Sequence, residues 1–193
     1  LILREAKSLA ELPEGATIGT GSKRRAFQLL ALRADLKIVD IRGNVDTRLN
    51  KMHEQKLDGI VLAAAGLKRL HMESVITQYL SMEEMIPAAA QGTLAIELRR
   101  EDRELLSMVN AFSDEKAQRI AQTEREFLQR IGGDCHLPIG AYASILADGQ
   151  IRLQALFGDA DGEHLAQCDV CGNEPESLAA AAVQQLKVCR SQI

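Results

Sequence analysis

Short apolar segments alternate with helical segments over the first 70 residues, and this alternation constrains the fold more than any other feature. The helical segments have the three-to-four-residue apolar spacing of amphipathic helices. Strands are expected over residues 16–19, 36–41 and 59–64, and helices over 24–33, 47–57 and from 67 onward. Strands that alternate with helices in this way predict an α/β layer with a largely parallel sheet.

The pattern changes after a break at residues 87–92, Pro-Ala-Ala-Ala-Gln-Gly. Residues 93–98 are strand-like and residues 102–111 have helical spacing. A long helix is expected next, with Ser113 as its N-cap and with Gly132-Gly133 directly after its end.

The last third of the chain predicts a small α+β domain. Its strand-like segments are expected over residues 141–146, 150–157 and 164–170, joined by turns at Asp148-Gly149 and Asp161-Gly162. Pro175 then begins a helix that runs to about Arg190. The expected architecture is a three-stranded antiparallel sheet with helices on one face.

The charge is unevenly distributed along the chain. The net charge is −4, yet residues 23–51 carry 8 basic and 3 acidic side chains. A local basic region in an acidic protein indicates a site for a small anion. The aromatic content of 3% and the absence of Trp argue against a nucleic-acid surface. No apolar run is long enough to span a bilayer.

The N-terminus and the cysteines indicate whether the protein is secreted and whether the sequence is part of a longer chain. The first residues, Leu-Ile-Leu-Arg-Glu, lack an initiator Met and do not resemble a signal peptide. We therefore expect the sequence to begin partway through a longer protein. With no secretory signal, the four cysteines are expected to be free thiols. The spacing Cys168-x-x-Cys171 lacks the second pair that a structural zinc site needs, so no metal site is expected.

The first candidate site is the loop at residues 19–25, Gly-Thr-Gly-Ser-Lys-Arg-Arg. A glycine-rich loop that enters a helix N-terminus presents backbone N–H groups to an anion. Cations in the first helical turn oppose the helix dipole, at a cost of about 0.3–1 kcal/mol each, which favours a bound anion. The alternative is a solvated basic helix start.

The second candidate is the loop at residues 42–48, Arg-Gly-Asn-Val-Asp-Thr-Arg. It also follows a predicted strand, and ligands of open α/β sheets bind beyond the carboxyl ends of the strands. Arginine pairs with carboxylates through two parallel hydrogen bonds. The two loops could therefore form one anion site, although two unrelated surface patches remain the alternative.

The third candidate is Cys135, within the stretch Gly-Gly-Asp-Cys-His-Leu-Pro-Ile-Gly at residues 132–140. Glycines on both sides favour an exposed thiol, whereas a lone Cys is more often a small buried hydrophobe. His136 is adjacent, but neighbouring side chains usually diverge, so no Cys–His pair is inferred. On the long helix, Glu124, Arg125 and Glu126 are interpreted as a solvated face.

Together these segments resemble the porphobilinogen deaminase (hydroxymethylbilane synthase) family. Residues 19–25 resemble its Gly-Thr-Ser-Ser-x-Arg-Arg loop, and residues 42–48 resemble its Arg-Gly-Asn-x-x-Thr-Arg motif. Residues 63–70 and 87–92 match in order, and residues 132–140 resemble the cofactor-attachment signature Gly-Gly-x-Cys-x-x-Pro-Ile-Gly. Two positions depart from the family pattern: Gly21 replaces a Ser, and Ala90 stands where Gly is common.

The resemblance implies an activity, a cofactor and a substrate. The family condenses four porphobilinogens head to tail, with loss of ammonia, on a dipyrromethane primer held by a thioether, here to Cys135. It then releases hydroxymethylbilane for tetrapyrrole and haem biosynthesis. The residues that the resemblance assigns to cofactor and substrate binding are Thr20, Ser22, Arg24, Arg25, Arg42, Gly43, Asn44, Arg48, Arg69 and Gln91.

The resemblance also implies a domain arrangement. Residues 1–86 would form a second domain of periplasmic-binding-protein type, residues 87–114 a hinge and a return segment of a first domain, and residues 115–193 the third domain. The catalytic Asp of the family lies in the first domain, and no segment here matches it. This chain alone is therefore expected to be inactive, and the full-length protein to be a cytoplasmic monomer.

Two other readings account for part of the sequence. A non-catalytic anion-binding module of periplasmic-binding-protein type explains the arginine loops but not Cys135 and its glycines. A thiol enzyme with Cys135 as nucleophile needs a base, and no candidate base is evident.

Overall fold

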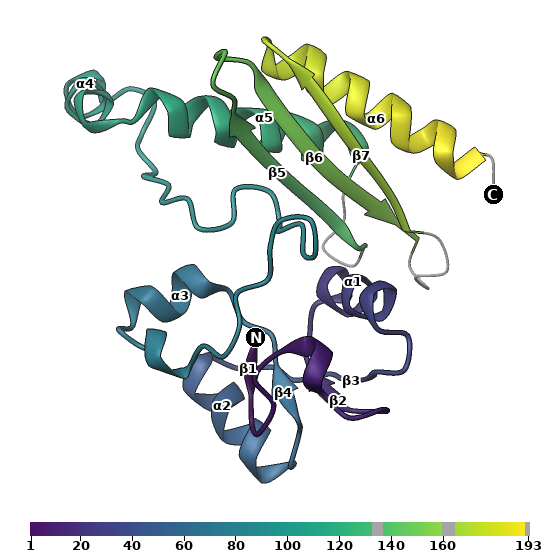
Figure 1. The fold of residues 1–193 in the computed structure, drawn as a ribbon. Coiled ribbons are helices and arrows are strands. Elements are labelled where there is room, and N and C mark those ends of the chain that lie inside the picture. Colours follow the sequence, from purple (N-terminus) through teal and green to yellow (C-terminus); the bar gives the residue numbers. More distant parts are fainter. Residues whose placement is uncertain (133–136, 160–164, 192–193) are drawn as a thin grey trace. The chain divides into compact units, whose positions relative to one another are not determined.

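The computed structural model describes residues 1–132, 137–159 and 165–191, except for the side chains of the last three. The chain divides into two compact units, the first built on Leu1–Ile86 and the second on most of the residues from Pro87 onward (Figure 1). Each unit has its own sheet, and each is considered by itself below.

The sheet of the first unit is mixed and largely parallel, as predicted. Its strands are β1 (Ile2–Leu3), β2 (Thr17–Gly19), β3 (Lys37–Val39) and β4 (Gly59–Ile60), in the order β1-β4-β2-β3. The central strand β2 is parallel to both of its neighbours, whereas β1 is antiparallel to β4. The carboxyl ends of β2 and β3 therefore lie at the same edge of the sheet.

Helices cover both faces of this sheet. They are α1 (Lys23–Leu32), α2 (Val45–Glu54) and α3 (Ala64–Arg69), with 3₁₀ turns η1 (Leu9–Glu11) and η2 (Glu73–Val75). Leu29 of α1 belongs to an apolar cluster with Ile18, whereas Met52 of α2 belongs to a second cluster with Ile60. Successive residues of a strand face opposite sides, so such clusters form on both faces of one sheet.

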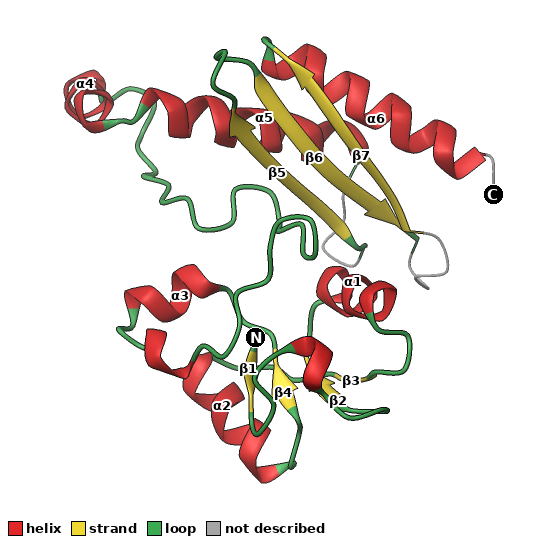
Figure 2. Cartoon of the chain, viewed as in Figure 1, coloured by secondary structure: helices red, strands yellow, loops and turns green. Residues whose placement is uncertain are grey.

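The second unit is an α+β fold, also as predicted. It contains α4 (Arg103–Phe112), α5 (Glu115–Ile131), β5 (Ile139–Ile145), β6 (Ile151–Gly158), β7 (Leu165–Gly172) and α6 (Pro175–Ser191). The strand order is β5-β6-β7, and α5 and α6 lie against one face of the sheet (Figure 2). Strands β5 and β6 form the predicted hairpin, with Gly149 at a positive φ of 85° in its turn.

Two local predictions in the second unit are wrong. Residues 93–98 form no strand, because no neighbouring strand among the described residues completes the backbone hydrogen bonds that a strand needs. The N-cap of α5 is Asp114 rather than Ser113, since the Asp114 carboxylate accepts hydrogen bonds from the N–H groups of Lys116 and Ala117. Ser113 instead ends α4.

Two further observations concern membranes and thiols. Within the described ranges, every helix is too short or too polar to cross a bilayer. Neither Cys168 nor Cys171 is in a disulfide; Cys168 is buried and Cys171 is exposed, because residues three apart on strand β7 face opposite sides of the sheet.

Candidate functional site

The two arginine loops meet at the carboxyl edge of β2 and β3. Thr20 directly follows β2, and its N–H donates to the carbonyl of Val39 at the end of β3, at 2.9 Å. A Cβ atom on Gly21 would lie 2.8 Å from the carbonyl oxygen of Ile41 and from Oδ1 of Asp40. The absence of a side chain at position 21 therefore allows the first loop to lie directly on the second.

The first loop leads into the N-terminus of α1. Ser22 occupies the N-cap position, but its side chain makes no capping hydrogen bond, and the first turn contains no acidic residue. Arg24 is only 7% exposed, and its Nη1 donates to the carbonyl of Ile86 at 2.6 Å. Arg25 is half-buried, and its Nη1 donates to the carbonyl of Val61 at 3.0 Å.

The electrostatic environment of these arginines is unfavourable for cations. Burial, and then the charge of Arg25, lower the pKa of Arg24 to about 9. Burial, and then the charge of Arg48, lower the pKa of Arg25. Arg48 belongs to the second loop, so the two loops bring like charges together. A bound anion would relieve this repulsion and would therefore be favoured here.

The second loop is held rigidly by its own side chains. The side chain of Asn44 caps α2 by accepting hydrogen bonds from the N–H and hydroxyl of Thr47, at 2.8 and 2.7 Å. Gly43 has a φ of 132°, and a Cβ atom there would lie 2.6 Å from Thr47. Nε of Arg48 donates to the carbonyl of Gly43 at 2.7 Å, so the arginine is tied to the loop it follows.

Arg42 is the exposed member of the second loop. Its Nε donates to Asp40 at 3.1 Å, and its side chain is 80% exposed. An exposed pair of this kind contributes at most about 1 kcal/mol in water. A ligand carboxylate can therefore replace Asp40 as the partner of Arg42.

The other predicted residues belong to other segments of the chain. Arg69 is exposed in the last turn of α3, in the first unit. Gln91 is exposed in the second unit, where its side-chain oxygen accepts a hydrogen bond from the N–H of Ala88 at 3.4 Å. Cys135 lies outside the described residues. The structure thus brings together the eight predicted residues of the two loops, from Thr20 to Arg48.

The interpretation of Glu124 as part of a solvated face is wrong. Glu124 is only 5% exposed, and its two carboxylate oxygens accept hydrogen bonds from the N–H groups of Ala90 and Ala143. The signal was present in the sequence, because Glu124 lies four residues after Ile120 and three before Phe127. This spacing places it on the buried face of α5.

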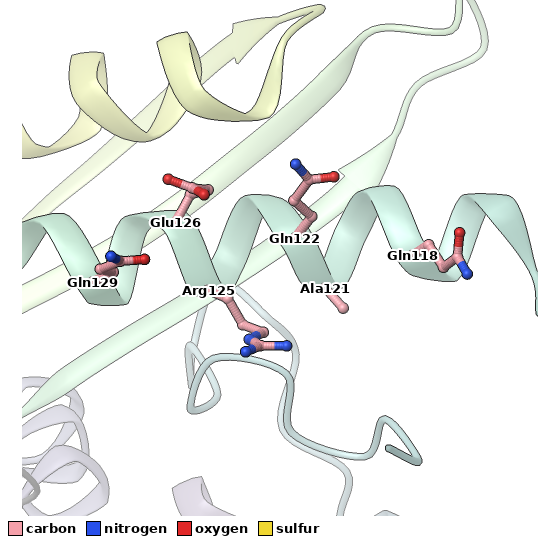
Figure 3. A pocket seen from close by; sticks show the side chains of 6 residues that line it. All are labelled: Gln118, Ala121, Gln122, Arg125, Glu126 and Gln129. Atoms are coloured by element: carbon pink, nitrogen blue, oxygen red, sulfur yellow. The ribbon is translucent and has the colours of Figure 1, made fainter. Parts of the chain in front are cut away.

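The neighbouring part of α5 is polar and open. A hollow lies along this helix, lined by Gln118, Ala121, Gln122, Arg125, Glu126 and Gln129 (Figure 3). Figure 3 shows Arg125 leaving the helix on the opposite side from Gln122 and Glu126. Across the described part of the chain, no three His, Cys, Asp or Glu side chains group as a metal site would require.

Comparison with known proteins matches both units. Residues 1–107, which include both arginine loops, match the family model "Porphobilinogen deaminase, dipyromethane cofactor binding domain". Residues 119–187 match the model "Porphobilinogen deaminase, C-terminal domain".

Curated relatives extend this similarity to nearly the whole chain. The porphobilinogen deaminase of Lachnospira eligens is 50% identical over 188 residues, which cover 96% of this chain and 64% of the relative. That of Brevibacillus brevis is 41% identical, over 96% of this chain and 60% of the relative. That of Clostridioides difficile is 47% identical, over 90% of this chain and 58% of the relative. The chain thus spans about three fifths of the length of these relatives, and it belongs to the porphobilinogen deaminase family.

Proposed function

We propose that this chain is the part of a hydroxymethylbilane synthase that binds the growing pyrrole chain. The full-length protein would condense four porphobilinogens with release of ammonia on a covalent dipyrromethane primer, and then release hydroxymethylbilane by hydrolysis. The observation that carries this proposal is the meeting of two arginine loops at one sheet edge, where burial, and then the charge of Arg48, lower the pKa of Arg25.

The residues present fit a dipyrromethane. Each pyrrole ring of this cofactor carries an acetate and a propionate, so the bound group is a polyanion. Arg25, Arg42 and Arg48 supply guanidinium groups that pair with carboxylates through two hydrogen bonds. Arg24, whose Nη1 is bound to the carbonyl of Ile86, adds positive charge at the same edge. When bound, the cofactor supplies the primer to which substrate units are added.

The protein would hold the pyrrole carboxylates in register. Fixed cations orient bound rings without reorganisation, which lowers the entropic cost of bringing reacting atoms together. Ser22 and the N-terminus of α1 add hydrogen-bond donors at this edge, and Thr20, Gly43 and Asn44 fix the shapes of the loops. Arg69 and Gln91 would complete the set, with Cys135 as the thioether attachment point.

We also infer the domain arrangement. Residues 1–86 would be a domain of periplasmic-binding-protein type, 87–114 a hinge and return segment that packs on a further domain, and 115–193 the cofactor-attachment domain. The exposure of Leu94, Ile96 and Phe112, at 77%, 67% and 88%, supports a packing partner for the return segment. We expect the full-length protein to be a cytoplasmic monomer that binds no nucleic acid.

Intact mass measurement of the full-length protein tests this proposal. The expected result is an added mass of one dipyrromethane, lost in the Cys135→Ser variant, together with turnover of porphobilinogen. Turnover without an adduct would contradict the attachment site. An unmodified protein that binds anions without turnover would favour a non-catalytic anion-binding module instead.

The 193-residue chain gives a second test. It contains no counterpart of the catalytic Asp that the family resemblance places in the first domain, so we expect no turnover from this chain alone. Porphobilinogen consumption by the purified 193-residue chain would show that a carboxylate within it performs this role.

A further inference from the structure

Glu124 joins three segments of the second unit. It lies on α5, and its Oε2 accepts a hydrogen bond from the N–H of Ala90, at 2.5 Å. Its Oε1 accepts a hydrogen bond from the N–H of Ala143 on β5, at 2.7 Å. A buried carboxylate that binds a loop and a strand at once fixes the position of the loop on the strand.

The loop that Glu124 holds is residues 87–92, and it adopts a conformation that its sequence does not favour. Ala90 has a φ of 56°, in the left-handed region that costs a residue with a Cβ atom more than it costs Gly. The loop closes on itself through hydrogen bonds from Gln91 N–H to the Ala88 carbonyl and from Thr93 N–H to the Ala90 carbonyl. The hydrogen bond to Glu124 therefore stabilises Ala90 in a backbone conformation that alanine disfavours.

The other end of the loop is held by the same strand. The N–H of Ala141 on β5 donates to the carbonyl of Pro87 at 2.9 Å. Two residues further along β5, the N–H of Ala143 points to the same side and donates to Glu124. The loop is thus tied to β5 directly at Pro87 and through Glu124 at Ala90.

We propose that Glu124 is a positioning residue that fixes the 87–92 loop and, through it, the side chain of Gln91. The assignment of Gln91 to ligand binding rests on the function proposed above, whereas the fixing of the loop does not. Both N–H groups need an acceptor, and only a carboxylate offers an acceptor oxygen to each. Burial raises the pKa of Glu124, and the N–H groups of Ala143 and Ala90 act in the opposite direction.

Amide hydrogen exchange on the 193-residue chain tests the fixing of the loop. Glu124→Gln keeps the size of the side chain but offers one oxygen, so one of the two N–H groups then faces the new NH₂ group. Strand β5 is also held by its backbone hydrogen bonds to β6, so we expect the hydrogen bond to the loop at Ala90 to be the one that is lost. We expect exchange at Ala90, Gln91 and Thr93 to rise about tenfold or more, with the β5–β6 ladder unchanged.

The matched control is Glu126→Gln, the same change two residues along α5. Glu126 pairs with Arg130 on the same helix, at 3.5 Å, and the exchange of the loop should not change in this variant. Unchanged exchange at Ala90 in Glu124→Gln, or equal loosening in both variants, would overturn the proposal.

A rescue variant separates positioning from general stability. Gly adopts positive φ readily, so Ala90→Gly combined with Glu124→Gln should restore much of the protection of Gln91 and Thr93. A general loss of packing around residue 124 would not be corrected by a glycine in the loop. Failure of this rescue, with the β5–β6 ladder also loosened, would assign Glu124 a purely structural role.

Steady-state kinetics of the full-length protein test the consequence for the ligand. We expect Glu124→Gln to raise KM for porphobilinogen by a larger factor than it lowers kcat, because positioning of a binding group is lost. The Glu126→Gln variant should match the wild type. A decrease in kcat with no change in KM would contradict the link between Glu124 and Gln91. Absence of turnover in the wild-type protein would contradict the proposed function, but it would not affect the conclusion from hydrogen exchange.

A pH titration of the wild-type chain by NMR tests the same proposal without a variant that could misfold. The amide resonances of Ala90 and Ala143 should both shift with pH, and their titration midpoints should equal that of the Glu124 carboxyl carbon. Two different midpoints, or an Ala90 resonance that does not follow Glu124, would show that the carboxylate does not join these segments.

Discussion

Among the described residues, the charged side chains that are buried are Arg24 in the first unit and Glu124 in the second, and Arg24 lies beside the half-buried Arg25. Burial, and then a neighbouring like charge, lower the pKa values of Arg24 and Arg25. The carboxylate is met by two backbone N–H groups that favour its charged form. In the first unit the nearest charges have the same sign, which a bound anion would offset, whereas in the second unit backbone N–H groups offset part of the cost of burying Glu124.

The largest expected effect follows from removing one of the cations. In the full-length protein, Arg25→Met or Arg48→Met should lower kcat/KM for porphobilinogen by about 10- to 150-fold, as expected for one charge-assisted hydrogen bond. Lys should not restore activity at either position, because it lacks the two-pronged geometry. Lys37→Ala, which removes an exposed cation at the start of β3, is the control. Wild-type kinetics in the arginine variants would contradict the anion site.

A smaller effect is expected from adding an anion to the 193-residue chain. Pyrophosphate at tenfold its Kd should stabilise the first unit by about 1.4 kcal/mol, measured as a shift in thermal unfolding. The shift should shrink in Arg25→Met and be absent for the second unit. Equal stabilisation of both units would indicate a general salt effect and would remove the contrast between them.

A paired charge on the surface of the first unit should respond to acid. Hydrogen bonds from the Arg33 guanidinium, and then from the Gly15 N–H, hold the pKa of Asp35 well below its ordinary value of 3.8. The folded-state pKa is thus below the unfolded one, so this contribution is present above pH 3.8 and is lost as the pH falls further. Asp35→Asn should lower stability at neutral pH, with the difference vanishing in acid, whereas Glu83→Gln should have no such effect.

Glu124 should give the opposite dependence on pH. Burial raises its pKa above the ordinary value of 4.5, so the folded second unit binds this proton more tightly than the unfolded chain does. Its favourable contribution is complete below pH 4.5 and is lost as the pH rises through the folded-state pKa. Across that range the stability of the wild type should fall relative to Glu124→Gln. A parallel pH dependence of the two proteins would mean that Glu124 is not desolvated.

The sequence predicted the types and order of most elements and the place of both arginine loops. Local periodicity distinguishes strand from helix, and the alternation of the two predicts parallel strands whose carboxyl ends share an edge. Predictions failed where the structure of a segment depends on which other group forms hydrogen bonds with it. Residues 93–98 have strand-like spacing but pair with no strand of the described ranges, and the carboxylate of Asp114 takes the N-cap role predicted for Ser113.

By itself the sequence determined that two arginine loops follow successive strands, because chain order and strand direction are encoded locally. Only the tertiary structure decided that Arg24 is buried against the Ile86 carbonyl and that Glu124 is buried against Ala90 and Ala143. A charged side chain looks alike in sequence whether it faces water or the interior. Its burial depends on whether groups far along the chain arrive to satisfy its hydrogen bonds, and that is settled only when the chain has packed.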